Sequence, residues 1–388
     1  MVYVLAGNNT DNCNSDNPVR RATLYAFDAV TGKARWTAST TGPARCTTAS
    51  TAVVGQWVYA PGLDGKVHRY AAGSGKEYLA AGWPLLYTLM PDVEKVAADL
   101  TATSRYLYVT TSGYIGDSGH YEGHLVTIDL RSGHENVFNS LCSNFKQLLG
   151  PTSGRSNYCD SQQSGLFGRG EGVVDPLTRD VYIVSGNGPW NGHTNWGDSV
   201  LKLNPSGSRL LDSFTPPNQA SLNVNDEDLG STGPALLPPL RAHGHMYHLL
   251  VQGGKGSACD GCSGTALRLL NRDNLSGHGG LGYVGGDLAD AFSPGKCQVL
   301  TAPAVWRPKA NSAWVFYANN CGVDGYRIVA TKRGFSLRTT WMAGNSGTTP
   351  VLHHGALYIA RSGHLTVYAA GSGKTLWDSS IGNIHWEY

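Results

Sequence analysis

The stretch Leu24-Tyr-Ala-Phe-Asp-Ala-Val-Thr-Gly-Lys-Ala-Arg-Trp36 has the pattern of a strand, a tight turn and a second strand. Tyr25 and Phe27 alternate with smaller neighbours, as the residues of a half-buried strand do. The turn is predicted between Asp28 and Gly32, and the return strand leads to Trp36. Near the other end of the chain the unit recurs almost unchanged as Leu365-Thr-Val-Tyr-Ala-Ala-Gly-Ser-Gly-Lys-Thr-Leu-Trp377. The chain therefore contains an internal repeat.

Weaker copies of this unit are found between the two clear ones, and they bring the total to seven. Successive copies are 39 to 75 residues apart. A step of about 40–50 residues with strand patterning alone is typical of a four-stranded propeller blade, and longer steps indicate inserted loops. The weaker copies are residues 67–76, 125–133, 200–207, 267–275 and 326–334.

These repeats predict an all-β fold, a single seven-bladed β-propeller over residues 1–388, with eight blades as the alternative. The chain begins with a middle-strand pattern at residues 2–7, so the first blade lacks its innermost strand. We expect residues 383–388 to supply that strand and to close the ring, which would remove exposed sheet edges. Inserted loops are predicted at about 139–165, 215–228 and 276–296.

Composition excludes some classes of partner. A formal net charge of +2 and only 15% charged residues argue against binding to nucleic acid or to an anionic membrane surface. We find no apolar run of the ~18–20 residues that a membrane-spanning helix needs, and residues 2–6 have the pattern of a strand rather than of a signal peptide.

Eight cysteines in loop-like surroundings favour disulfide bonds and an oxidising, extracellular or periplasmic location. Pairing of neighbours would join Cys13 to Cys46, Cys142 to Cys159, Cys259 to Cys262 and Cys297 to Cys321, although the sequence does not fix the connectivity. The spacing of Cys259 and Cys262 also occurs in redox and zinc half-sites, but a small loop-closing disulfide is the preferred interpretation.

One loop is more specific than the rest. It runs from Ser185 to Asp198 and contains Gly186-Asn187-Gly-Pro-Trp-Asn191. This segment resembles a motif of the quinoprotein alcohol dehydrogenases. The repeat unit resembles that of the pyrroloquinoline-quinone (PQQ) repeat propellers, whose architecture is similar to that of WD40-like folds. The resemblance implies that Asn187, together with Glu171 and Asp228, could bind calcium.

Two further positions follow from the same resemblance. The loop 225–230 is similar to the one that supplies the catalytic base in those enzymes, which places Asp228 or Asp226 in that role. Lys255 is similar to their basic residue near the quinone oxygens. Calcium would polarise the quinone, a carboxylate would take the alcohol proton, and a cation would favour the reduced cofactor.

The chain also departs from that pattern. Arg169 stands roughly where the enzymes carry a tryptophan that stacks under the quinone, which leaves Arg169 and Trp190 as the candidates for the two faces of a cofactor pocket. Adjacent cysteines, which cover the other face in many of these enzymes, do not occur in the sequence. Asn187 and the acidic loop could equally be an ordinary hairpin and a solvated surface.

The preferred interpretation is therefore a secreted or periplasmic binding or scaffold protein. It would recognise a protein or glycan on one rim, or a small molecule in the central funnel, and it would need no PQQ. The alternative is a calcium- and PQQ-dependent dehydrogenase of an alcohol or a sugar, with Asp228 or Asp226 as its base. Fold analogy alone does not decide between the two.

Overall fold

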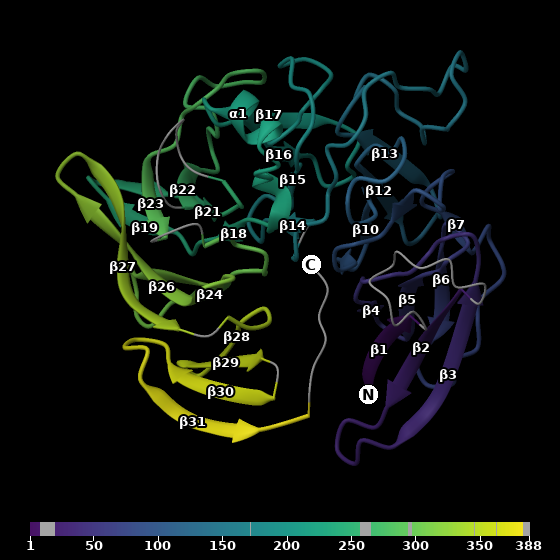
Figure 1. Ribbon diagram of the computed structural model, residues 1–388, viewed down its shortest axis with the longest axis horizontal. Coiled ribbons are helices and arrows are strands. Elements are labelled where there is room, and N and C mark those ends of the chain that lie inside the picture. Colours follow the sequence, from purple (N-terminus) through teal and green to yellow (C-terminus); the bar gives the residue numbers. More distant parts are fainter. Residues whose placement is uncertain are drawn as a thin grey trace.

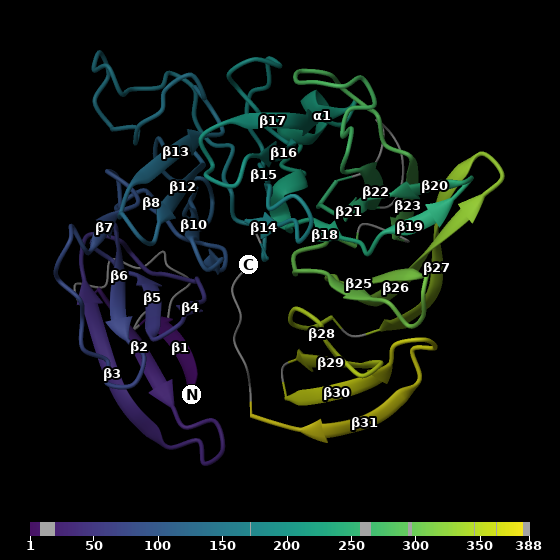
Figure 2. The same cartoon turned by 180° about the vertical axis from the view of Figure 1, so that it is seen from behind.

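The structure of the protein is a computed structural model that describes residues 1–7, 20–170, 172–256, 265–293, 297–344, 346–361 and 363–382. These residues form an almost all-β molecule in which antiparallel sheets follow one another around a common centre (Figure 1). The first strands of the sheets, such as β14 (Val173–Val174) and β28 (Val351–His353), lie nearer the centre than the last ones. The view from behind shows the same arrangement (Figure 2). The predicted fold class is thus confirmed as all-β.

Seven sheets carry the repeats, and the first of them has three strands while the other six have four. The first sheet contains β1 (Val2–Gly7), β2 (Arg21–Phe27) and β3 (Ala34–Thr41). The second contains β4 (Ala52–Val54), β5 (Trp57–Pro61), β6 (Lys66–Ala71) and β7 (Leu85–Leu86). The third contains β9 (Thr101–Ala102), β10 (Tyr106–Thr110), β12 (His124–Asp129) and β13 (Glu135–Asn139). The fourth contains β14, β15 (Val181–Val184), β16 (Val200–Leu203) and β17 (Leu210–Phe214).

The remaining sheets follow the same order. The fifth contains β18 (Ala235–Leu236), β21 (Leu249–Gln252), β22 (Thr265–Asn271) and β23 (Ala289–Ser293). The sixth contains β24 (Ala304–Trp306), β25 (Ala313–Ala318), β26 (Gly322–Thr331) and β27 (Gly334–Gly344). The seventh contains β28, β29 (Ala356–Arg361), β30 (His364–Ala369) and β31 (Thr375–Ser380). Two two-stranded sheets are added, β8 (Glu94–Lys95) with β11 (Ser112–Gly113) and the hairpin of β19 (Leu240–Ala242) with β20 (His245–Tyr247).

The burial of each strand follows its place in the sheet. All four residues of β15, Val-Tyr-Ile-Val, are buried, because this strand is covered by neighbouring sheets on both faces. In the outer strand β3 the exposed and half-buried residues alternate, as expected of a strand with one face toward solvent. Burial therefore distinguishes this middle strand from the outer strand of a sheet.

The repeated turn has the same backbone hydrogen bonds in distant parts of the chain. The amide of Asp28 donates to the Lys33 carbonyl over 2.8 Å, and the amide of Ala369 donates to the Lys374 carbonyl over 2.8 Å. Each turn has a glycine at φ +68°, Gly32 in the first and Gly373 in the last, where a residue with a side chain would be strained. The two clear sequence copies are thus also copies in three dimensions.

Aromatic side chains in several sheets donate a hydrogen bond to a carbonyl of the following sheet. The indole of Trp36, in the first sheet, donates to the Ala72 carbonyl in the turn of the second sheet over 3.0 Å. The indole of Trp341, in the sixth sheet, donates to the Ala370 carbonyl in the turn of the seventh over 2.7 Å. A Cβ on the turn glycine Gly75 would lie 2.5 Å from the Trp36 ring. The absence of a side chain at Gly75 therefore allows the indole to pack against the turn. This contact recurs because the sequence unit that makes it recurs.

Tyrosines make the same kind of contact elsewhere in the molecule. The hydroxyl of Tyr108 in the third sheet donates to the Pro205 carbonyl in the fourth over 2.6 Å. Apolar clusters lie between the same successive sheets, for example the one that includes Tyr182, Phe214 and Leu250 between the fourth and the fifth. The core is thus a series of interfaces between sheets.

Ring closure is the part of the predicted fold that falls outside the described residues, because the expected closing strand is 383–388. Trp377 in the last sheet aligns with Trp36, yet its side chain is 48% exposed. Among the described residues, none places an atom within 4 Å of a Cβ built on Gly32, the turn glycine of the first sheet. A closed ring of seven blades therefore stays a prediction.

Several predicted boundaries need correction. The predicted loop 276–296 contains strand β23, which completes the fifth sheet. The predicted loop 215–228 contains a short helix, α1 (Gln219–Val224), and a 3-10 turn (Leu229–Ser231) follows it. The first strands are shorter than expected, as in β14, where two residues pair although five were predicted.

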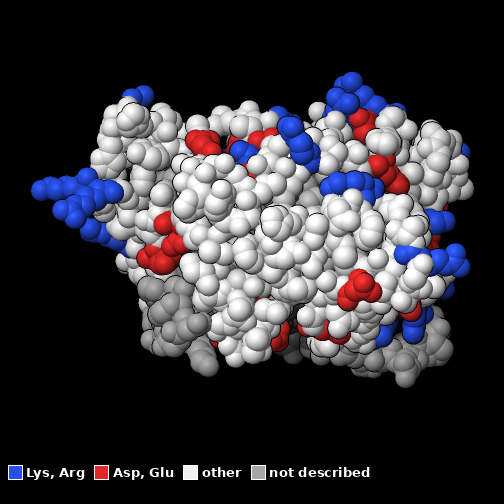
Figure 3. Space-filling view, turned by 90° about the horizontal axis from the view of Figure 1, so that it is seen from above, with Lys and Arg blue, Asp and Glu red and all other residues white. Residues whose placement is uncertain are grey.

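A disulfide between Cys142 and Cys159 closes the long loop after β13, as predicted. A second disulfide joins Cys297 to Cys321, also as predicted. The predicted pairs that involve Cys13, Cys259 and Cys262 lie outside the described residues and stay predictions. In the space-filling view charged side chains of both signs are scattered over a largely uncharged surface (Figure 3). None of the helices that the structure describes is long and apolar enough to cross a membrane.

Arg69 is surrounded by aromatic rings in the second sheet. Its guanidinium carbon lies 4.0 Å from the centre of the Trp57 ring, 4.7 Å from Tyr78 and 5.7 Å from Trp83. A cation over aromatic faces is stabilised by the ring quadrupole, by about 0.5–2 kcal/mol depending on desolvation. This cluster therefore ties the third strand of the sheet to the loop that follows it.

Replacing Arg69 with Ala should lower the free energy of unfolding by about 2 kcal/mol, because both the cation–π contacts and the packed side-chain stem are lost. Urea denaturation followed by tryptophan fluorescence measures the change. The matched control is Arg327→Ala, which removes an exposed arginine from the equivalent third strand of the sixth sheet and should change stability by less than about 0.5 kcal/mol. Equal effects of the two substitutions would show that the aromatic cluster contributes nothing.

Candidate functional site

The candidate site lies where loops from the third, fourth and fifth sheets meet. Asp117 comes from the loop between β10 and β12, Asn187 from the loop between β15 and β16, and Lys255 from the loop between β21 and β22. Asp226 and Asp228 come from the connection between β17 and β18. Because neighbouring strands are antiparallel, all four segments emerge at the same end of the sheets. We call this end the loop face.

Asp228 is the centre of the site. One carboxylate oxygen, Oδ1, accepts the backbone N–H of Asn187 over 2.7 Å. The other, Oδ2, accepts from Nζ of Lys255 over 2.6 Å. The Asp228 side chain is 9% exposed and that of Lys255 is 20% exposed, so the ion pair is largely shielded from water. The structure thus brings together the three predicted residues Asn187, Asp228 and Lys255.

Asn187 links this ion pair to Asp226. Its amide nitrogen Nδ2 donates to Asp226 Oδ1 over 2.7 Å, and Lys255 Nζ lies 4.0 Å from the same oxygen. The amide oxygen of Asn187 is buried and has no hydrogen-bond partner among the described residues. Asp226 itself is open to solvent, with its side chain 73% exposed.

The charges of the site act on one another. Burial disfavours the charged form of Lys255, but the carboxylates of Asp228, Asp226 and Asp117 outweigh it and raise its pKa. Burial also raises the pKa of Asp117, and the negative charges of Asp228 and Asp226 raise it further, against the hydrogen bond that Tyr121 donates to it. The ammonium of Lys255 is therefore held among acidic groups.

Close packing around Asp228 depends on Gly186. A Cβ at this position would lie 2.4 Å from Asp228 Oδ1 and 2.9 Å from the ring of Phe167, so only glycine fits between them. Phe167 is half-buried, and the Lys255 ammonium lies 5.8 Å from its ring centre. The site thus combines an ion pair with an aromatic ring.

Asp198, at the end of the Asn187 loop, is a second buried acid. It accepts the backbone N–H of Leu229 over 3.0 Å, which fixes the chain next to Asp228. Burial raises its pKa well above the usual range, and the charge of Asp228 adds to this. Asp198 therefore supports the site as a neutral acid.

The other predicted cofactor residues have different surroundings. Nη1 of Arg169 donates to the carbonyls of Thr48, over 2.7 Å, and Ala97, over 3.1 Å, which lie at the inner edges of the second and third sheets. Trp190 packs against the apolar cluster between the third and fourth sheets. Glu171, predicted as a calcium ligand, lies outside the described residues. The role of each in cofactor binding stays a prediction.

Sequence reasoning missed Asp117, Tyr121, Phe167 and Asp198. Asp117 could have been identified from the repeat. Its loop connects the second and third strands of the third sheet, just as the loops of Asn187 and Lys255 do in the fourth and fifth sheets. Phe167 is two residues from Arg169, the position that was considered for stacking. Tyr121 joins the site through Asp117 in its own loop, and Asp198 joins it through the backbone of Leu229; the repeat pattern contains neither contact.

The described donor groups fit calcium poorly. Both oxygens of Asp228 already have partners within the protein. The ammonium of Lys255 occupies the position beside Asp228 that a metal ion would need. Among the described residues no three acidic, histidine or cysteine side chains are grouped as a metal site would need. The amide oxygen of Asn187 is the feature that favours a cation here. We derive no chemistry through calcium from these residues.

Comparison with known proteins supports the repeat. Residues 1–147 match the family model described as outer membrane protein assembly factor BamB, which is less than half of the chain. No curated protein sequence matches the chain significantly. The resemblance to PQQ-repeat propellers that the sequence indicated is thus confirmed in this part of the chain.

Solved structures share the fold. The quinohemoprotein alcohol dehydrogenase ADHIIG from Pseudomonas putida HK5 has a TM-score of 0.63 and 13% identity, and the match covers 98% of this chain and 69% of that one. A europium-containing methanol dehydrogenase has a TM-score of 0.62 and 14% identity, with coverage of 98% and 81%. Sqt1 of Saccharomyces cerevisiae has a TM-score of 0.56 and 13% identity, with coverage of 98% and 82%. At these identities the likeness shows the fold alone.

Replacing Lys255 with Met should lower the free energy of unfolding by about 3 kcal/mol, because the shielded Asp228 carboxylate loses its charge partner. The double variant Lys255→Met with Asp228→Asn should recover most of this loss. Urea denaturation at pH 7 measures both. Lys374→Met, at an exposed lysine, is the control. A loss below about 0.5 kcal/mol in the single variant would mean that water, not Lys255, stabilises Asp228.

Replacing Asp198 with Asn should change the pH dependence of stability. The folded state holds the Asp198 proton at pH values where the unfolded chain, with a pKa near 3.9, has released it. The free energy of unfolding of the wild type should therefore fall relative to the variant as pH rises from 5 toward 9, by at most about 1.4 kcal/mol per pH unit. Denaturation at pH 5, 7 and 9 tests this, with the exposed Asp160→Asn as control. Parallel curves for wild type and Asp198→Asn would contradict a buried neutral acid.

Proposed function

Taking the chain as a PQQ-type repeat propeller, we propose that it is a binding protein that acts outside the cytoplasm and recognises its partner on the loop face, without using a quinone. The partner is expected to present a hydrogen-bond donor, either a cationic side chain or a hydroxyl group, to the acidic groups around Lys255. The ring of seven blades, completed by residues 383–388, is part of this proposal.

The observation that carries the proposal is the internal pairing of Asp228. A general base needs a carboxylate oxygen that is free to take a proton, whereas here Asn187 and Lys255 each hold one oxygen of Asp228 at hydrogen-bond distance. Such a paired and shielded carboxylate suits a fixed binding surface. Asp226, which is exposed, is then the acceptor that a partner meets first.

Charge supports the same conclusion. Asp228 and Asp226 lie 2.6 and 4.0 Å from the ammonium of Lys255, and the charge of Asp117 also raises its pKa. The surplus of acceptors favours donors and cations over anions. A planar anionic cofactor would have to rely on Lys255 alone, and that ammonium is already paired with Asp228.

The disulfides support the proposed location. Cys142–Cys159 and Cys297–Cys321 close surface loops, and such bonds persist in oxidising compartments. We therefore place the protein in the periplasm or outside the cell.

A specific observation keeps the dehydrogenase as the second candidate. Phe167 provides an aromatic ring beside Lys255 and Asp228, at the place where a quinone could stack. In that case Asp228, or Asp226, would be the base, Lys255 would lie near the quinone oxygens, and Asn187 with Glu171 would hold calcium. The Lys255–Asp228 pair would have to open for Asp228 to accept a proton.

Titration with PQQ and calcium separates the two candidates. We expect no saturable quinone binding by the wild type at micromolar concentrations, followed by quinone absorbance and by thermal unfolding. Tight, calcium-dependent binding that is lost in Asn187→Ala and in Asp228→Ala would overturn the proposal and establish the dehydrogenase.

A crosslinking experiment tests the binding role directly. A photo-reactive amino acid at Asp226, on the loop face, should capture one defined partner in the cells that make the protein. The same group at Leu177 should not capture it. Leu177 is also exposed, but it follows the end of β14 that points away from the loop face. Addition of Asp228→Ala should reduce the yield at position 226. Equal capture from both positions would contradict recognition by the loop face.

A further inference from the structure

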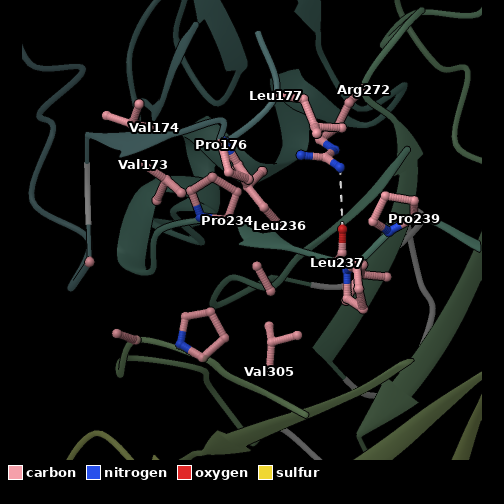
Figure 4. Close-up of a pocket in the computed structure, with 15 residues that line it drawn as sticks. Val173, Val174, Pro176, Leu177, Pro234, Leu236, Leu237, Pro239, Arg272 and Val305 are labelled. Atoms are coloured by element: carbon pink, nitrogen blue, oxygen red, sulfur yellow. Dashed lines mark hydrogen bonds between the residues drawn. The ribbon is translucent and has the colours of Figure 1, made fainter. Parts of the chain in front are cut away.

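Two of the cavities in the molecule differ in what they offer a ligand. The first, of about 420 Å³, lies along β14, β18 and β24 and has an apolar wall rich in proline (Figure 4). Its charged residue, Arg272, donates to Asp175 Oδ2 over 2.9 Å and to the Leu237 carbonyl over 3.2 Å, the second of these contacts being drawn in Figure 4. That charge is balanced within the protein, so the first cavity does not select one class of ligand.

The second cavity is a groove of about 470 Å³ on the third sheet. One wall is β13, the last strand of that sheet, and the other is the loop that the disulfide Cys142–Cys159 closes. Asn139 ties the two walls together, because its Nδ2 donates to the carbonyls of Phe145, over 3.0 Å, and Gln147, over 3.1 Å. The groove is therefore preformed, and we call it the β13 groove.

The β13 groove is far from the loop face. β13 begins directly after a copy of the repeated turn, in which the amide of Asp129 donates to the His134 carbonyl over 2.9 Å. This turn joins β12 to β13, whereas the loop of Asp117 joins β10 to β12. Because neighbouring strands are antiparallel, Glu135 at the start of β13 and the loop face lie at opposite ends of the third sheet. The groove is thus separate from the site of the proposed function.

Glu135 is the acidic residue of the groove. It lies on the same face of β13 as Val137, which also lines the groove, because residues two apart in a strand point the same way. Its half-buried carboxylate has no hydrogen bond or ion pair with any residue that the structure describes, and neither oxygen is fully buried. Burial raises the pKa of Glu135, against the opposing charge of His134. A ligand in the groove can therefore reach a carboxylate that lacks a partner.

The lysine of the groove does not supply that partner. Nζ of Lys146 donates to the Ser143 carbonyl over 2.7 Å and lies 5.5 Å from the centre of the Phe138 ring. Phe138 is next to Val137 in β13 and therefore points to the other face of the strand. The ammonium of Lys146 is thus directed away from Glu135, and the groove keeps its negative charge.

The remaining side chains of the groove add acceptors and an aliphatic surface. Nε2 of Gln147 donates to the Ser156 carbonyl over 3.4 Å, and Nδ2 of Asn157 donates to the Leu148 carbonyl over 3.3 Å. Their amide oxygens accept no hydrogen bond within the described part of the chain. Leu89, which is 44% exposed, and Leu148 provide hydrocarbon surface. The groove therefore favours a ligand with a cationic donor and an aliphatic chain.

We propose that the β13 groove binds a small aliphatic primary amine, whose ammonium donates to the Glu135 carboxylate and whose chain lies against Leu89 and Leu148. A hydrogen bond between an ammonium and a carboxylate is roughly twice as strong as one between neutral groups. An alcohol of the same length gains the contacts of the chain but not the ion pair. An anion is disfavoured because it would meet the carboxylate of Glu135.

Isothermal titration calorimetry with n-hexylamine at pH 7 tests the proposal. The amine is protonated at this pH and should bind saturably to one site at millimolar concentrations. 1-Hexanol has the same chain without the charge, and hexanoate has the opposite charge. Each of these should bind at least about tenfold more weakly, as the loss of a hydrogen bond between charged groups predicts. Equal affinities for the amine and the alcohol, or no saturable binding of the amine, would overturn the proposal.

Two variants locate the amine. Glu135→Gln keeps the shape of the side chain and removes its charge, so the affinity for n-hexylamine should fall at least about tenfold while that for 1-hexanol stays the same. Ser156→Trp places a ring at an exposed position of the loop wall and should weaken the binding of both compounds. The control Glu227→Gln neutralises another half-buried glutamate, in the connection between β17 and β18, and should change neither affinity.

Circular dichroism and thermal unfolding establish that each variant is folded. An unchanged affinity for n-hexylamine in folded Glu135→Gln would refute the role of the carboxylate. Loss of amine binding in Asp226→Ala would place the amine at the loop face and would likewise overturn the proposal. Failure of the groove is therefore distinguishable from failure of the function proposed for the loop face.

Discussion

The aromatic side chain that donates to a carbonyl in the next sheet is the contact on which the rest of the structure depends. Each sheet is stable within itself through its ladder of hydrogen bonds, but those ladders do not fix how one sheet sits against another. Trp36 on Ala72, Tyr108 on Pro205 and Trp341 on Ala370 do so, because each of these bonds has a defined direction as well as a buried ring. The apolar clusters between the same sheets then have one register in which to pack.

The loop face inherits its geometry from these contacts. Asp117, Asn187 and Lys255 belong to loops of three different sheets. The connection that bears Asp228 crosses from the fourth sheet to the fifth, and its carboxylate bonds to both. Buried acids such as Asp198 and close approaches such as that at Gly186 are tolerated because the sheets are held rigidly. Polar strain of this kind is concentrated where a protein binds or reacts.

The sequence predicted the repeated part of the fold well and the exceptions poorly, for physical reasons. Strands such as β2 and β30 have side chains that alternate between two environments, and this alternation is visible locally. The short inner strands show no such alternation, and residues beside them, such as Leu100 and Val299, hydrogen-bond to the adjacent sheet. Strand β23 was taken for a loop since glycines precede it.

The site was predictable only in part. Asn187, Asp228 and Lys255 were identified through a resemblance in motifs, and the structure joins them. Phe167 and Asp198 belong to the same site through contacts that connect residues distant in the sequence, which no local pattern records. The burial of the individual strands has a consequence for dynamics. In an array where each unit is held by its neighbours, a segment with fewer buried contacts opens more often. The backbone amides of β31, whose residues are mostly exposed, should accordingly exchange their hydrogens sooner than those of β15, whose four residues are all buried.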